Sequence, residues 1–97
     1  MSYTLDLPPD TRGQIVDFIA AFGDGPERRI AINAILDELN KLAVNPKLGT
    51  PIYGGPLERR RIHRFLVNAG VTRELQFAYM VFESTKTVVI SGFDEAP

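Results

Sequence analysis

The chain has 97 residues, of which 44% are hydrophobic and 24% charged, and its formal net charge is −1 at pH 7. Length and composition predict a single folded domain over residues 1–97 rather than a disordered chain. The sequence contains no cysteine and one histidine, which excludes disulfides and cysteine nucleophiles and argues against a metal site. We therefore expect no metal and no cofactor. No apolar stretch reaches the ~18 residues of a membrane span, and we expect a cytoplasmic protein.

Positive charge is concentrated in the middle of the chain. The net charge is −3 over residues 1–26, +4 over residues 27–64 and −2 over residues 65–97. Four arginines and the single histidine fall within residues 58–64, immediately before an apolar run. Because the chain as a whole is slightly acidic, any binding to nucleic acid has to be local to this segment.

The first half of the chain predicts one strand and two helices. Residues 3–7 alternate apolar and polar side chains, as in a strand with one buried face. Pro8-Pro9 ends this strand and suits the first turn of a helix that Gly23 ends. A second helix begins near Pro26 and stops at Asn45-Pro46. The apolar faces of the two helices comprise Ile15, Phe18, Ile19 and Phe22 in the first, and Ile32, Ile35, Leu36, Leu39, Leu42 and Ala43 in the second.

The second half predicts three strands after a loop over residues 47–57. The strands cover residues 60–67, 72–82 and 87–93, and the short turns between them favour an antiparallel meander. The element order is thus β-α-α-β-β-β. It predicts an α+β fold in which a helical hairpin packs on one face of a curved antiparallel sheet.

This order and several segments resemble the RelE/ParE superfamily of type II toxin–antitoxin toxins. The similar segments are residues 3–9, 39–49, 61–64, 76–83 and 87–93, which span nearly the whole chain. The closing Ile90-Ser91-Gly92-Phe93 is most similar to the HigB-like branch. The resemblance implies a small cytoplasmic toxin that a cognate antitoxin neutralises. Ribonuclease members cleave messenger RNA on the ribosome without a metal, whereas ParE-like members share the fold and poison DNA gyrase.

The candidate site begins with the basic segment. If Ile62 faces the core, Arg61 and His63 point to the other face, where His63 can transfer protons near neutral pH. Alternatively, the segment is a solvated edge strand whose charge protects it against aggregation, or a surface that binds an acidic antitoxin. For a ribonuclease of this kind, we expect Arg61, His63 and Arg73 to be catalytic. We expect contacts with RNA or a partner from Arg59, Arg60, Arg64, Lys47, Gln76 and Tyr79, although a solvated surface position is the more economical interpretation of Lys47.

Two features depart from the ribonuclease pattern. Ribonuclease members carry an Arg three residues before a Tyr, but Gln76 holds that position before Tyr79, and the odd offset of Arg73 from Gln76 places Arg73 on the opposite face. The tail after Phe93 is acidic, which repels RNA. Tyr79 also shares a strand face with Leu75 and Phe77, as a core aromatic residue does.

The sequence therefore supports three functions. The first is a toxin that inhibits translation by metal-independent mRNA cleavage. The second is a non-enzymatic binding module on the same fold, either a gyrase poison or an inactive antitoxin-binding homologue. The third is a structural or adaptor domain with a charged edge.

Overall fold

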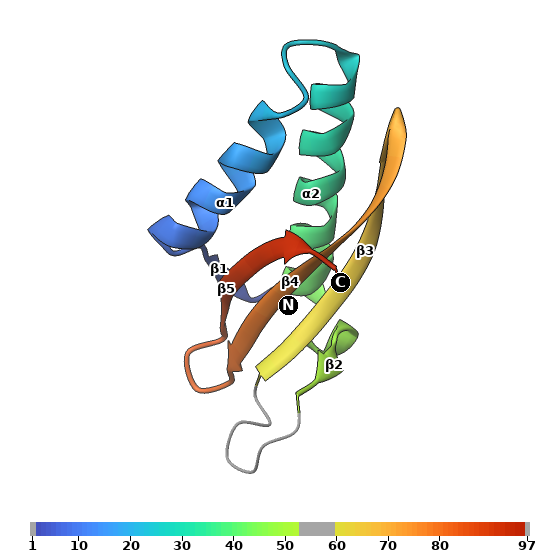
Figure 1. The fold of residues 1–97 in the computed structure, drawn as a ribbon. Coiled ribbons are helices and arrows are strands. Elements are labelled where there is room, and N and C mark those ends of the chain that lie inside the picture. Colours follow the sequence, from blue (N-terminus) through green and yellow to red (C-terminus); the bar gives the residue numbers. More distant parts are fainter. Residues whose placement is uncertain (1, 53–59, 97) are drawn as a thin grey trace.

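Five strands form one sheet in the order β1-β5-β4-β3-β2, and two helices pack on one of its faces (Figure 1). The computed structural model describes residues 2–52 and 60–96. Its elements are β1 (Thr4–Asp6), α1 (Pro9–Ala20), α2 (Pro26–Val44), the 3-10 turn η1 (Pro46–Leu48), β2 (Thr50–Pro51), β3 (Arg60–Ala69), β4 (Val71–Phe82) and β5 (Thr87–Glu95). The expected α+β class and element order are confirmed.

The sheet is mixed rather than antiparallel throughout. β3, β4 and β5 form the expected antiparallel meander, but β1 pairs with β5 in parallel, with Leu5 opposite Val88. Parallel neighbours need a long connection, and both helices and strands β2 to β4 separate β1 from β5 along the chain. The loop expected over residues 47–57 also contains η1 and the two-residue strand β2, which pairs with β3.

The helices begin where proline and acidic residues favour a first turn. Pro9 and Pro26 occupy the first turns of α1 and α2, and each is followed by a carboxylate, Asp10 or Glu27, that complements the helix dipole. The helices converge at the turn that joins them and diverge away from it (Figure 1). α1 lies against β5 and α2 against β3.

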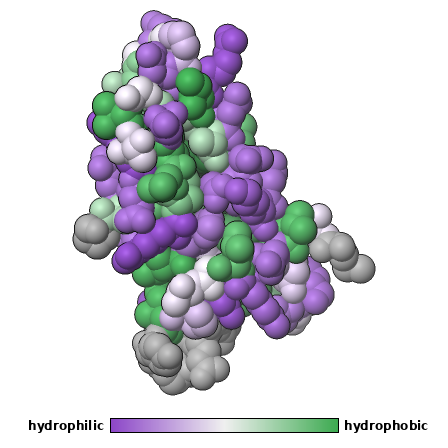
Figure 2. Space-filling model, turned by 90° about the vertical axis from the view of Figure 1, so that its right-hand side faces the viewer, coloured by the Kyte–Doolittle hydropathy of each residue, from purple (hydrophilic) through white to green (hydrophobic). Residues whose placement is uncertain are grey.

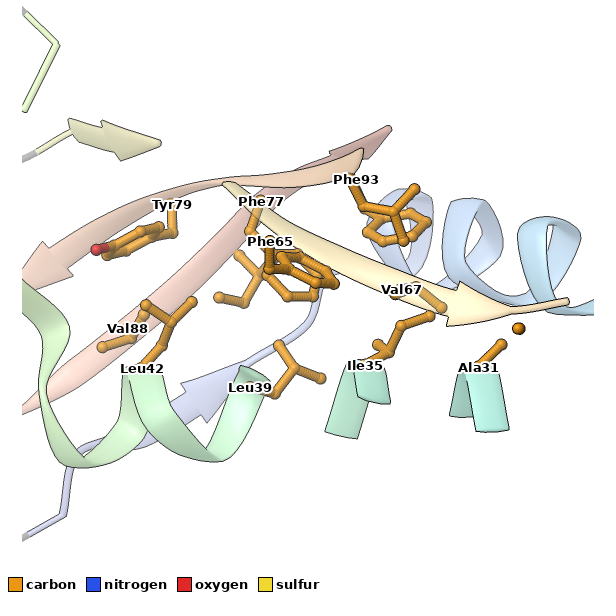
Figure 3. Packing of buried hydrophobic residues seen from close by; sticks show 13 residues of the cluster. Ala31, Ile35, Leu39, Leu42, Phe65, Val67, Phe77, Tyr79, Val88 and Phe93 are labelled. Carbon is orange, nitrogen blue, oxygen red and sulfur yellow. The ribbon is translucent and has the colours of Figure 1, made fainter. Parts of the chain in front are cut away.

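The core lies between α2 and the strand residues that point toward it (Figure 3). It comprises Ala31, Ile35, Leu39, Leu42, Phe65, Val67, Ala69, Leu75, Phe77, Tyr79, Val88, Ile90 and Phe93. β5 contains an irregularity: Tyr79 pairs with Ile90 while Ala78 pairs with Gly92, which leaves Ser91 as an extra residue. This bulge returns Phe93 to the core face, opposite Phe77.

In the part of the chain that the structure describes, no helix is both long and apolar enough to cross a membrane.

Candidate functional site

The side chains of β3 alternate between the helix-covered face and the face that no described helix covers, here called the open face. Phe65 and Val67 are buried toward the helices, so Arg61 and His63 share the helix-covered face with them. The expected orientation, with Ile62 in the core and Arg61 and His63 on the other face, is therefore wrong. The longer apolar alternation after residue 64 sets the register, because reversing it would expose two large core side chains.

Arg61 is held by the backbone of the segment between α2 and β3. Its guanidinium donates hydrogen bonds to the carbonyl oxygens of Gly49, at 2.6 Å, and Lys47, at 3.3 Å. Tyr79, on the neighbouring strand, contacts the same segment. Its hydroxyl donates to the Pro46 carbonyl at 2.6 Å and accepts from the Gly49 amide at 2.9 Å. These two side chains fix η1 and the start of β2 against the sheet.

The core position expected for Tyr79 is confirmed, because its side chain is 1% exposed. Figure 3 shows it at one end of the buried cluster, with its hydroxyl directed away from the neighbouring aromatic rings. Burial raises the pKa of the Tyr79 hydroxyl above its usual range. Because this hydroxyl is neutral and already hydrogen-bonded to two backbone groups, we assign it a structural role.

His63 pairs with a carboxylate of α2. Its Nε2 lies 2.7 Å from Glu38 Oε1, and the other carboxylate oxygen accepts a hydrogen bond from Lys41 at 2.6 Å. The His63 and Glu38 side chains are only 11% and 14% exposed, and the imidazole stacks on Phe65. Burial alone would raise the pKa of Glu38, but the hydrogen bonds from Lys41 and His63 outweigh it and hold that pKa below its usual range.

Sequence reasoning missed Glu38 as the partner of His63. Its position carried a signal, because Glu38 follows Ile35 by three residues and precedes Leu42 by four, so it falls on the buried face of α2. A carboxylate on a buried helix face needs a hydrogen-bonding partner.

Arg73 lies far from the basic residues of β3, at the other end of the helix-covered face. Its guanidinium is 5.7 Å from the ring centroid of Phe18 and 5.6 Å from that of Phe22, and it forms an ion pair with Glu95 at 3.3 Å. The structure thus places it on the face opposite Gln76, as the sequence offset predicts. It does not bring Arg73 together with Arg61 and His63.

The open face carries cations without partners. Arg60 and Arg64 point there, and no hydrogen bond or ion pair joins either of them to another residue in the described ranges. Gln76 lies directly opposite Arg64, and Asp94 lies directly opposite Gln76. The Gln76 Oε1 atom is covered and has no hydrogen-bonding partner among the described residues.

The remaining two predicted binding residues are Arg59 and Lys47. Arg59 falls outside the described residues. Lys47 is exposed in η1, and its charge acts on Glu83 near the turn after β4. The Tyr3 hydroxyl, then Lys86, lower the pKa of Glu83, and Lys47 adds to the effect. Lys47 therefore lies near enough to the β4–β5 turn for its charge to act on Glu83.

Two hollows border the basic strand. One, of about 520 Å³, is lined by Leu48, Gly49, Thr50, Pro51, Ile52, Ile62, His63 and Arg64. The other, of about 290 Å³, is lined by Ile52, Arg60, Arg61, Ala78, Tyr79, Met80 and Ser91. The segment that Arg61 and Tyr79 hold thus lines the first hollow, and Ile52, just after it, lines both. On the side of the molecule shown in Figure 2, hydrophilic residues separate the exposed apolar ones.

Within residues 2–52 and 60–96, no three carboxylate or imidazole side chains gather closely enough to hold a metal ion.

No protein-family model matches this chain. No curated protein matches it by sequence. Its fold, however, is similar to that of solved toxin structures. The RelBE2 toxin–antitoxin complex from Mycobacterium tuberculosis matches over 99% of this chain and 100% of the other, with a TM-score of 0.61 and 18% identity. A mutant of the Escherichia coli toxin RelE in the free state matches over 99% of this chain and 85% of the other, with a TM-score of 0.63 and 13% identity. The chain therefore has a RelE-like fold.

Proposed function

We propose that this protein is the toxin of a type II toxin–antitoxin system and that it inhibits translation by cleaving mRNA without a metal. The observation that carries the proposal is the presence of two guanidinium groups, Arg60 and Arg64, on the open face of a RelE-like fold, neither with a hydrogen-bonding or ion-pair partner among the described residues. Four residues apart on one strand, they lie about 13 Å apart along it. Cations in this arrangement, beside a hollow, suit the phosphates of a single-stranded RNA.

The proposal changes the roles expected of the other basic residues. Arg61 and His63 are engaged by the Gly49 carbonyl and by Glu38, so we assign them to holding the fold beneath the site. Arg73 is engaged with Glu95 and two aromatic rings, and we assign it the same kind of role. The RNA-contacting residues are then Arg60, Arg64 and the amide of Gln76.

A cognate antitoxin is the proposed protein partner, and the cytoplasm is the proposed location. One of the structures with this fold is a toxin–antitoxin complex, which supports such a partner here. The basic middle of the chain favours an acidic segment in the antitoxin, because complementary charge speeds and orients association.

The test is inducible expression of the chain, alone and with the product of the adjacent gene. We expect growth arrest that the neighbour relieves, with breaks in mRNA mapped by primer extension. An Arg60→Gln/Arg64→Gln double variant should lose the arrest, while Arg28→Gln, on α2 and paired with Asp24, should keep it. Arrest that the double variant retains in full would contradict the open-face site.

A non-enzymatic binding module is the second candidate, and the open face itself favours it. Gln76 is neutral and Asp94 is negative at positions where cleavage of a phosphodiester is helped by positive charge. Such a module would act on DNA gyrase or only bind an antitoxin. Arrest with intact mRNA and inhibited supercoiling would identify the gyrase poison, whereas no arrest together with antitoxin binding would identify the inactive homologue.

A further inference from the structure

Three side chains form a row across the open face. The strand register places Arg64 of β3 opposite Gln76 of β4, and Gln76 opposite Asp94 of β5. Residues directly opposite each other on neighbouring strands point to the same face. Arg64 and Asp94 are thus two strand spacings apart, about 10 Å, with the Gln76 amide between them.

The β5 bulge gives the two carboxylates of the tail different surroundings. It places Glu95 opposite Leu75, on the helix-covered face, where Arg73 pairs with it. Asp94 falls on the open face, and no hydrogen bond or ion pair joins its side chain to another described residue. Its oxygens are therefore accessible acceptors on the same surface as the unpaired Arg64.

We infer that Asp94 is the general base of the proposed RNA cleavage and that Arg64 stabilises the phosphate. The inference rests on the proposed function. The Asp94 carboxylate takes the proton of a ribose 2′-hydroxyl, and O2′ forms a bond to the adjacent phosphorus as the bond from phosphorus to O5′ breaks. O5′ leaves with the electron pair and takes a proton from water. The products are a 2′,3′-cyclic phosphate and a 5′-hydroxyl, and protonated Asp94 returns its proton to water.

The described open face offers few other groups for this step. His63 and Tyr79 lie on the helix-covered face, and both have partners there. Apart from Asp94, the open-face carboxylate on β3, β4 and β5 is Glu74, which lies opposite Leu66, in the neighbouring row rather than in the row of Arg64 and Gln76. The Gln76 Oε1 atom is covered, so the amide nitrogen, in the centre of the row, is the group left to donate a hydrogen bond to the ribose or the phosphate between base and cation.

The experiment compares Asp94→Asn with Glu74→Gln, which removes the same charge from the same face. Single-turnover cleavage of a defined mRNA on ribosomes gives the rate, and co-sedimentation with ribosomes carrying the 2′-O-methyl form of that mRNA gives binding without cleavage. We expect Asp94→Asn to lower the rate about 100-fold or more. Its binding should be unchanged or tighter, because a negative charge has been removed. Glu74→Gln should cleave at the wild-type rate.

The outcomes separate this inference from the proposed function. If the wild type cleaves and Asp94→Asn cleaves as fast or faster, Asp94 only repels RNA, and the inference fails while the function stands. Equal losses in Asp94→Asn and Glu74→Gln would show an effect of surface charge and would also overturn it. If the wild type cleaves mRNA but its products lack the cyclic phosphate, attack by the 2′-hydroxyl is refuted and the inference fails while the proposed function stands. If the wild type leaves mRNA intact, the proposed cleavage fails, and the inference fails with it.

Discussion

The Tyr79 hydroxyl is a polar group at the end of a buried aromatic row, and two backbone groups depend on it. Replacing Tyr79 by Phe removes only this oxygen and leaves the Pro46 carbonyl and the Gly49 amide without their partner. We expect Tyr79→Phe to lower the free energy of unfolding by about 1–3 kcal/mol, as for a buried group left unsatisfied. Urea unfolding measures this change.

Tyr3→Phe is the matched control for that prediction. The Tyr3 hydroxyl donates to Glu83 at an exposed position, where water can replace it. Its loss should cost less than about 1 kcal/mol. Equal costs for the two variants would contradict a structural role for the Tyr79 hydroxyl.

Gly49 is required by the same contact. A Cβ atom at this position would lie 2.6 Å from the Tyr79 hydroxyl and 2.8 Å from the Ile62 carbonyl oxygen, and the second is backbone that cannot move aside cheaply. We expect Gly49→Ala to destabilise the protein by about 1–3 kcal/mol through overpacking. Gly13→Ala, inside α1 with nothing within 4 Å of the added atom, should instead stabilise it by about 0.5–1 kcal/mol. Thermal unfolding of both variants tests the opposite signs.

Residue types predicted the core better than they predicted the site. The alternation of Leu75, Phe77 and Tyr79 was sufficient to place Tyr79 in the core. Arg61 and His63 were misplaced because a charged residue on a strand face suggests solvent. Both side chains instead find partners, Arg61 in the backbone of residues 47–49 and His63 in Glu38, which are distant in sequence. Such contacts depend on how the rest of the chain packs against β3, and the local pattern of residue types along a strand does not reveal them.

At the scale of elements, the contact between the Glu38 carboxylate and His63 connects α2 to β3. Hydrogen bonds from Lys41 and His63 hold the pKa of Glu38 below its ordinary value near 4.5, despite its burial. A lowered folded-state pKa stabilises the fold above the unfolded-state value and loses that effect as pH falls through the folded-state value. The contribution of Glu38 should therefore be complete at pH 7 and vanish in acid.

Glu38→Gln tests this linkage. We expect the variant to be less stable than the wild type by about 1 kcal/mol or more at pH 7. The difference should shrink toward zero as the pH falls through and below the lowered folded-state pKa of Glu38, because the wild-type carboxyl is then protonated as well. Denaturant unfolding across this range measures it. Asp17→Asn, an exposed change on α1, should show no such trend, and a constant difference for Glu38→Gln would refute the linkage.

The elements themselves followed from the sequence wherever periodicity was long. Both helices and the three-strand meander have clear periods, proline starts and turn residues, and they were placed correctly. The parallel pairing of β1 and the two-residue β2 were not, because strands this short are defined by their neighbours rather than by their own pattern. The bulge at Ser91 was also missed, and it decides which tail carboxylate reaches the open face.

At the scale of the whole molecule, the fold separates arginines that hold structure from arginines that face solvent. The sequence showed one basic segment, but strand alternation divides it, with Arg61 toward the helices and Arg60 and Arg64 toward the open face. Because the net charge of the chain is −1, attraction to RNA has to come from local groups, and we expect Arg60 and Arg64 on the open face to supply it.

The salt dependence of RNA binding measures this division. Each phosphate contact to a single strand contributes about 0.7 to the slope of log K against log salt concentration. If Arg60 and Arg64 each contact a phosphate, Arg60→Gln and Arg64→Gln should each reduce the slope by about 0.7, and the double variant by about twice that. Arg28→Gln makes the same change in net charge on α2, where Asp24 pairs with the guanidinium, and should leave the slope unchanged. Equal slope changes in all three single variants would mean that RNA responds to the overall charge of the protein. That result would refute the open face as the RNA-binding surface.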